Sequence, residues 1–377
     1  MVFRRMSSLL ATAALSVCAF GQNASRNESG SASMVLVPGD PLELVTGPAR
    51  IVDTPADRDA IAQLLARARN SYALQGAGRG YDLKVTFTAN SQGQTQYDGD
   101  WAMEDLFDPR QGLRWTASAT AGFTVTRISS NGTSYSEGTT GPIPLRLQEA
   151  RAALFNPIPS ATNVKRQSIR TATTVRAGAT LTCILLSGSG SGANAAPGRR
   201  WDETEECIDP ASGLLQVHSQ VPGRYYAYDY ANALRSGNRV LPRKVTVTEA
   251  GRVVSTISVE SLTEVPGADP SLFVPTEEMK TRGRAIAVEQ AQKIFTVLPQ
   301  GAAAPGGTAR TVCVFGLVTA SGQLVEAHSL QPWDPDSQTA LEAVKRMKFA
   351  APAAPGAPPQ QHFVFVIGRF VAPAAAL

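Results

Sequence analysis

Apolar and polar residues alternate along much of the chain between residues 81 and 264. Tyr81–Thr88 and Lys244–Glu249, for example, place apolar side chains at every second position, which is the period of a β-strand with one buried face. Turn sequences such as Asn131-Gly132 and Val221-Pro-Gly223 separate the segments. The pattern predicts a large antiparallel β-sheet, which has to close or have its inner face covered.

Helical spacing interrupts this pattern at three places. Thr54 and Pro55 suit the N-cap and first turn of a helix whose apolar residues recur with a period of 3.6 as far as Tyr72. Two further helices are predicted at Pro142–Phe155 and Glu277–Phe295. The predicted fold class is therefore α+β, with a half-barrel-like antiparallel sheet and few helices.

The last stretch, residues 306–377, has its own order of elements. An apolar strand at Thr311–Thr319 is followed by a Ser-Gly turn and a second strand. A helix with an apolar stripe comes next, and a last strand of alternating side chains begins near His362. We expect a small ββαβ domain.

The first 21 residues have the layout of a secretory signal, with Arg4 and Arg5, an apolar stretch, and small residues before a cleavage site predicted after Gly21. A lipidated Cys18 and an uncleaved membrane anchor are the alternatives. We expect a periplasmic protein. Its predicted parts are a signal peptide (1–21), a disordered leader (22–50), a β-rich domain (51–275), a helix and flexible linker (276–305) and the C-terminal domain (306–377).

Composition and charge narrow the possible functions. The formal net charge of the 377 residues is +4, and loss of Arg4 and Arg5 lowers it to about +2 (4 − 2). So small and scattered a charge argues against binding to nucleic acid. The length is sufficient for two hydrophobic cores.

Three cysteines remain once the signal is removed. In an oxidising compartment Cys183 and Cys207 are the predicted disulfide, closing a loop that the chain-entropy estimate values at about 3 kcal/mol. Cys313 lies in an apolar strand and is expected to be a small buried residue.

Recognisable catalytic and metal-binding motifs are missing from the sequence. The three histidines, His218, His328 and His362, have no second metal-type ligand at helical or turn spacing, and CxxC, HExxH and Gly-x-Ser-x-Gly do not occur. The glycine-rich runs lack the Gly-Lys-Ser/Thr ending of a phosphate loop. We therefore predict a protein that is not an enzyme, without cofactor or metal.

Residues 306–371 resemble the C-terminal domain of TonB-type energy transducers, on the strength of Gly316, Gly322, the run Ala340–Val344 and Phe349. The resemblance implies docking by strand addition, in which the last strand pairs with a peptide of an outer-membrane receptor or another envelope protein. The implied edge strand is His362, Phe363, Val364, Phe365, Val366 and Ile367. The alternative is that these strands form a core or pair with the neighbouring domain.

Residues 50–275 resemble periplasmic lipoprotein carriers of the LolA kind. The similar segments are Cys207–Gly213 with the following leucines, Tyr228-Asp-Tyr, Leu241-Pro-Arg-Lys and Asp269-Pro-Ser-Leu-Phe. This resemblance implies a half-open barrel whose concave face is covered by helices and holds acyl chains. Its apolar ligand face would include Trp101, Trp115 and Phe123.

These features support two predictions of function. The first is a non-catalytic periplasmic adaptor in outer-membrane transport, acting through the TonB-like domain. The alternative is a periplasmic carrier of a lipid or lipoprotein, acting through the β-rich domain. An exposed edge at His362–Phe370 would favour the adaptor, and an apolar cavity beside Trp101, Trp115 or Phe123 would favour the carrier.

Overall fold

The computed structural model describes residue 44 and residues 48–158, 164, 167–188, 198–297, 310–350 and 360–370. All of them belong to one compact unit, residues 34–377. The predicted signal peptide and most of the predicted leader lie outside the described residues. No helix of the described part of the chain is both long and apolar enough to cross a membrane.

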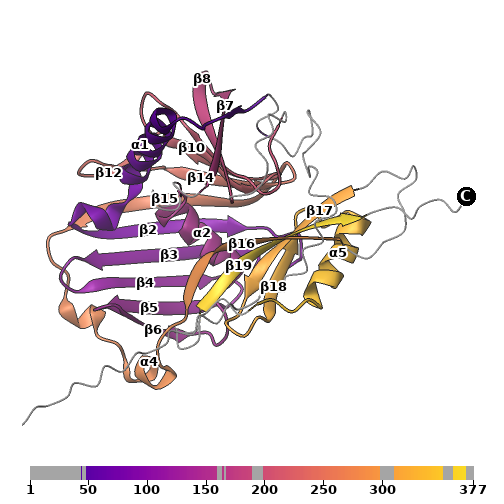
Figure 1. The fold of residues 1–377 in the computed structure, drawn as a ribbon. Coiled ribbons are helices and arrows are strands. Elements are labelled where there is room, and N and C mark those ends of the chain that lie inside the picture. The colour runs from indigo at the N-terminus through magenta and orange to yellow at the C-terminus, as the bar shows by residue number, and fades with distance from the viewer. Residues whose placement is uncertain are drawn as a thin grey trace, which may run out of the picture. The chain divides into compact units, whose positions relative to one another are not determined.

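A 13-stranded sheet forms the larger part of the molecule (Figure 1). Its strand order is β1-β7-β8-β9-β10-β11-β14-β15-β2-β3-β4-β5-β6, and every neighbouring pair is antiparallel. The strands are β1 (Arg50–Ile51), β2 (Gly80–Ala89), β3 (Gly99–Asp108), β4 (Gly112–Ala119), β5 (Thr124–Ser130), β6 (Thr133–Gly138), β7 (Ser168–Arg176), β8 (Ala179–Ser187), β9 (Thr204–Ile208), β10 (Leu215–Val221), β11 (Arg224–Asp229), β14 (Lys244–Glu249) and β15 (Arg252–Val265). The sheet is open, since β1 and β6 at its two ends do not pair with each other.

Two helices cover one face of this sheet, here called the inner face. Helix α1 (Pro55–Tyr72) begins as predicted, because Thr54 caps it by accepting a hydrogen bond from the Asp57 backbone and Pro55 occupies its first turn. Helix α2 (Leu145–Phe155) follows β6. Apolar residues of both helices and of the strands form one large core cluster, so the alternation seen in the sequence does mark a buried face.

The opposite, outer face is partly covered by short segments. A 3₁₀ turn, η2 (Pro270–Phe273), contacts β4 and β5, and α4 (Glu277–Arg282) contacts β6.

Another 3₁₀ turn, η1 (Leu74–Ala77), follows α1, and a separate hairpin pairs β12 (Leu234–Ser236) with β13 (Arg239–Leu241).

The predicted helix Glu277–Phe295 is wrong beyond its first turns. Helix α4 ends at Arg282, and Gly283 takes a φ of 82°, a left-handed value that favours glycine. The chain continues as a strand, β16 (Ala287–Val297), which pairs in parallel with the last strand. The segment predicted as helix and linker therefore supplies a strand to the C-terminal sheet.

The C-terminal domain contains the predicted ββαβ order, here β17 (Arg310–Val318), β18 (Leu324–Ser329), α5 (Pro335–Lys345) and β19 (Gln360–Phe370). Its strand order is β16-β19-β17-β18. Because β19 is hydrogen-bonded to β16 on one side and to β17 on the other, it is an inner strand. The prediction that His362, Phe363, Val364, Phe365, Val366 and Ile367 form a free edge strand is wrong.

Both faces of this small sheet are buried. One face packs under α5, where Val312, Val314 and Val364 meet Leu341 and Val344. The other face packs against residues of the β-rich part, in a second cluster of Leu145, Trp201, Val221, Cys313, Phe315, Leu317, Leu330, Phe365 and Ile367. The alternative interpretation, in which the C-terminal strands form a core with the neighbouring domain, agrees with this packing.

The predicted disulfide is confirmed. Cys183 of β8 and Cys207 of β9 are directly opposite each other in the ladder and are bonded through their sulfur atoms. They lie on the outer face in a small cluster with Leu181 and Val217. Cys313 is buried, as expected, and burial raises the pKa of its thiol to about 12.

Gly316 offers a test of how closely β17 and β18 approach. A Cβ atom on Gly316 would lie 2.4 Å from the carbonyl oxygen of Glu326. This oxygen belongs to the backbone of β18, which is paired with β17 and cannot shift as easily as a flexible side chain. We expect Gly316→Ala to lower the free energy of unfolding by about 1 to 3 kcal/mol, the usual cost of overpacking. Urea unfolding measures this difference. Gly188→Ala is the control, since no atom lies within 4 Å of its added Cβ, and an equal effect of both variants would contradict the close approach.

Candidate functional site

The three residues predicted as an apolar ligand face come together on the inner face. Trp101, Trp115 and Phe123 are 2%, 4% and 1% exposed and belong to the large core cluster. The Trp101 ring stacks on Phe87 at a centroid distance of 5.2 Å and lies 5.6 Å from the ring of Phe123. We call these four aromatic residues the aromatic floor. Their burial shows that the floor is covered, not open to solvent.

Helix α2 lies against the aromatic floor and is held there partly by polar contacts. Arg151 of α2 places its guanidinium 4.1 Å from the centre of the Trp115 ring. The same guanidinium donates two hydrogen bonds to the buried carboxylate of Asp105 in β3, at 2.5 and 2.9 Å. Farther along the helix, the Tyr228 hydroxyl donates to the carbonyl oxygen of Ala153. An apolar floor is thus covered by a helix whose anchors include ionic groups.

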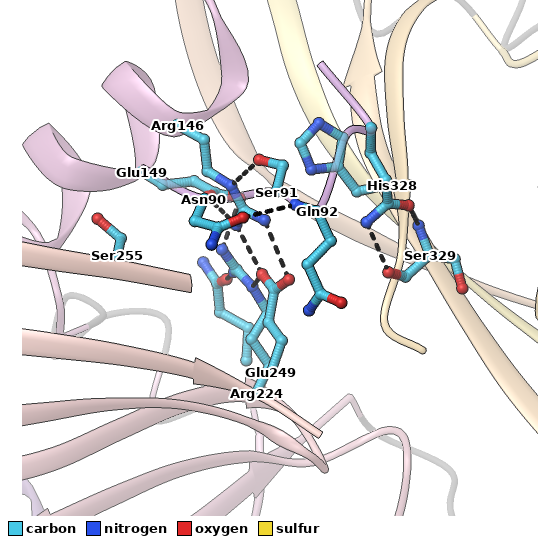
Figure 2. Close-up of polar contacts among 12 residues, drawn as sticks. Asn90, Ser91, Gln92, Arg146, Glu149, Arg224, Glu249, Ser255, His328 and Ser329 are labelled. Carbon is cyan, nitrogen blue, oxygen red and sulfur yellow. Dashed lines mark hydrogen bonds and ion pairs between the residues drawn. The ribbon is translucent and has the colours of Figure 1, made fainter. Parts of the chain in front are cut away.

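The first turns of α2 carry a second anchor, the Arg146 cluster, which consists of Arg146, Glu149, Arg224 and Glu249 (Figure 2). Arg146 donates to both carboxylate oxygens of Glu249, at 2.6 and 3.0 Å, and pairs with Glu149 at 3.0 Å. Arg224 pairs with Glu149 at 2.6 Å and with Glu249 at 3.0 Å. Ser91 accepts a further hydrogen bond from Arg146 at 2.9 Å.

Charge balance makes this cluster possible inside the protein. Two guanidinium groups face two carboxylates, and all four side chains are buried. Burial alone would raise the pKa of Glu249, but the neighbouring Arg146 and Arg224 outweigh this effect and hold the pKa at about 2. The cluster joins α2 to the adjacent ends of β11 and β14, because Arg224 and Glu249 are opposite each other in that ladder.

The C-terminal domain touches the same anchor. The Phe315 ring of β17 lies 4.6 Å from the Arg224 guanidinium and 5.7 Å from that of Arg146. The backbone N–H of Leu145, at the start of α2, donates to Glu326 of β18 at 2.7 Å. His328 also contacts Glu326, at 2.9 Å. The position of α2 therefore depends on the C-terminal domain as well as on the large sheet.

Three cavities lie along the described part of the large sheet. A cavity of about 260 Å³ lies beside the aromatic floor, at the ends of β5 and β6, and is lined by Phe123, Val125, Ser136, Glu137, Thr139, Thr140, Gly141, Ile143 and Arg282. The outer face carries two open grooves of about 720 Å³ each, one over β2 to β5 and one over β10, β11 and β14. Only the smaller cavity touches a residue predicted to face a ligand.

Groups that could carry out chemistry are already engaged with one another. His218 contacts Glu206 at 3.0 Å, and Ser91 accepts a bond from a cation instead of donating to a base. Within the described ranges, one group of metal-type side chains lies within reach of a single ion, namely Cys183, Glu205 and Cys207, and two of these are bonded to each other.

Sequence reasoning identified Trp101, Trp115 and Phe123 of the aromatic floor but missed Phe87, the Arg146 cluster and the Arg151–Asp105 pair. The available signal was the presence of Arg146, Glu149 and Arg151 within an otherwise apolar helix. Charged residues are rarely buried without partners, so their positions in α2 could have suggested buried ion pairs. Their partners could not be identified from spacing alone.

The Arg146 cluster gives a direct test by substitution. We expect Glu249→Gln to lower the free energy of unfolding by about 3 to 5 kcal/mol, because it leaves two buried guanidinium groups with one carboxylate. Urea unfolding at neutral pH checks this. Glu260→Gln is the control, because Glu260 forms a 3.8 Å pair on the surface with Arg243, and exposed pairs contribute about 1 kcal/mol or less. Similar losses in the two variants would contradict the role of the cluster.

The depressed pKa of Glu249 also sets a dependence on pH. A carboxylate whose pKa is about 2 in the folded protein and about 4.5 when unfolded stabilises the fold above the higher value. That contribution is lost as the pH falls from about 4.5 to about 2. We expect the unfolding free energy of the wild type to decrease more steeply over this window than that of Glu249→Gln. Parallel pH profiles of the two proteins would contradict this assignment.

Comparisons with known proteins identify no family for this chain. No family model matches the sequence, and no curated protein matches it. Among solved structures, similarity is found to a putative outer membrane lipoprotein-sorting protein domain from Vibrio parahaemolyticus (7% identity, TM-score 0.32, 55% of this chain and 97% of that chain). A LolA superfamily protein from Nitrosomonas europaea (9%, 0.36, 56% and 96%) and MucB (10%, 0.29, 76% and 97%) are also similar. With all three TM-scores below 0.5, these similarities establish neither a family nor a function, and the TonB-like resemblance of residues 306–371 stays a prediction.

Proposed function

We propose that this protein is a periplasmic carrier that binds the acyl chain of a lipid or lipoprotein on the inner face of its large sheet. The aromatic floor would contact the chain, and α2 would act as the lid. This proposal follows the alternative drawn from the sequence. An adaptor that docks through His362–Ile367 is not retained, because those residues belong to an inner strand.

The observation that carries the proposal is the way α2 covers the aromatic floor. Phe87, Trp101, Trp115 and Phe123 present a broad apolar surface, and a single helix of 11 residues lies over part of it. A helix anchored through ion pairs can exchange them for water when it moves away, whereas exposed aromatic rings need an apolar partner. A long acyl chain supplies such a partner.

The size of the free space requires movement of the lid. Ligand pockets commonly occupy about 300 to 1,000 Å³, and the cavity beside Phe123 is about 260 Å³. A long chain therefore does not fit while α2 stays in place. We infer that binding displaces α2 along the floor from the β5 and β6 side.

Quenching of tryptophan fluorescence tests the proposal. The chain has four tryptophans, of which Trp101 and Trp115 belong to the floor, whereas Trp201 lies in the cluster next to the C-terminal domain and Trp333 is 45% exposed. We expect a bromine-labelled long-chain fatty acid to quench the floor tryptophans in a saturable manner, because bromine quenches on contact. The double variant Trp201→Phe/Trp333→Phe should keep the quenching.

The matched double variant Trp101→Phe/Trp115→Phe should lose most of this quenching while it still binds the chain. Its aromatic rings remain, so the floor is conserved in character. Saturable quenching that survives in this second variant and disappears in the first would place the ligand elsewhere. Absence of saturable quenching in the wild type would contradict the carrier function.

A further inference from the structure

Arg127 of β5 lies on the inner face next to the aromatic floor. In the ladder it stands opposite Trp115 of β4 on one side and Ser136 of β6 on the other. Val125, two residues before it on the same face, belongs to the large core cluster. Its guanidinium donates to the backbone carbonyl of Ile286 at 2.5 Å. The side chain therefore reaches the segment after α4, where Ala285 donates a backbone hydrogen bond to Ser134 of β6.

No carboxylate pairs with Arg127 among the residues that the structure describes. Its Nε is buried and has no hydrogen-bond partner. Burial, together with the positive charge of Arg151, lowers the pKa of Arg127 to about 10. Arg127 is therefore still charged near neutral pH. Asp105, the acid closest to Arg151, already uses both oxygens to bind that residue.

The fully buried arginines of the protein are paired with carboxylates. Arg146 and Arg224 share Glu149 and Glu249, and Arg170 is held by both oxygens of Glu203. A charge removed from water is normally compensated in this way. Arg127 is half-buried, and it is a positive charge beside the aromatic floor that no carboxylate of the described residues neutralises.

We infer that Arg127 binds the anionic group of the ligand, a carboxylate or phosphate ester carried by a long acyl chain. The inference rests on the proposed carrier function and specifies the class of its ligand. The cavity beside Phe123 is lined by Ser136, the ladder partner of Arg127, and also by Glu137 and Arg282, of which Arg282 already pairs with Glu278. A tail lying on Phe123 would thus place its head near the Ser136 hydroxyl and the neighbouring Arg127.

The chemistry of arginine suits this role. A guanidinium presents N–H donors in a planar fork that matches the oxygens of a carboxylate or phosphate. Arg127 uses one of its terminal nitrogens for Ile286, and its Nε has no hydrogen-bond partner among the described residues. A head group bound here would displace water from the cation and balance its charge.

A panel of ligands with one acyl chain and different head groups tests the inference. The heads are the carboxylate of a fatty acid, the phosphate of a lysophosphatidic acid and the neutral glycerol of a monoacylglycerol. In the wild type we expect the two anionic ligands to bind at least about tenfold more tightly than the neutral one, the effect of one charge-assisted hydrogen bond or more. Titration calorimetry or tryptophan quenching measures the affinities.

In Arg127→Gln this preference should fall to less than about threefold, while the affinity for the neutral ligand stays unchanged. Arg114→Gln is the matched control: it removes the same charge from the neighbouring strand β4, where Arg114 alternates with Trp115 and lies on the outer face. That variant should keep the preference. Arg127→Lys retains the charge without the fork and should show an intermediate preference, which serves as the readout if the glutamine variant does not fold.

Each outcome has a distinct meaning. Binding of all three ligands with equal affinity, or a preference that persists in Arg127→Gln, would overturn the inference and leave the carrier function intact. Failure of every acyl ligand to bind would contradict the carrier function itself. Inorganic phosphate is the remaining probe: if it binds the wild type through Arg127 as tightly as the phosphate lipid does, the site is one for a soluble anion, and the assignment to a lipid head is wrong.

Discussion

Burial of charge in the first turns of α2 is the constraint on which the rest of the structure depends. Arg146 and Glu149 leave water only because Arg224 and Glu249 meet them from the ends of β11 and β14. Phe315 and Glu326 of the C-terminal domain pack against the same helix start. One balanced cluster thus fixes the lid, the sheet and the C-terminal domain relative to one another. Displacement of any one of the three would separate charges within the cluster, and an unpaired buried charge lowers the stability of the fold.

This arrangement gives the C-terminal domain a role different from strand addition. Its last strand is internal, one face of its sheet packs under α5, and the other face supports the region where α2 begins. A domain in this position stabilises α2 against the large sheet. Arg127 and the aromatic floor lie beneath and beside the other half of α2, where Arg151 is the anchor. The two halves of the helix therefore have separate tasks, one structural and one next to the proposed ligand.

The parts of the fold that could be predicted from the sequence are those determined locally. Alternation identified the large sheet, Thr54 and Pro55 marked the start of α1, and the two cysteines could be paired from compartment and spacing. Strand β16 could not be recognised, because Ala, Glu, Gln and Lys favour a helix and its strand conformation is imposed by parallel pairing with β19. Gly283, which ends α4, was the one local sign of the change. The Arg146 cluster was equally hidden, since Arg146 and Glu249 are 103 residues apart.

In the candidate site, too, some features could be predicted from the sequence and others depend on tertiary contacts. Trp101, Trp115 and Phe123 were expected to face a ligand because residues 50–275 resemble lipoprotein carriers, and they do gather on one face. That this face is covered by α2, and that no described carboxylate pairs with Arg127 beside it, depends on tertiary contacts that no local pattern encodes. The most direct test of the account is native mass spectrometry of the mature protein isolated from its own cell envelope. The account predicts a bound mass corresponding to an anionic lipid or acylated molecule, and a protein that remains ligand-free even after incubation with such lipids would contradict it.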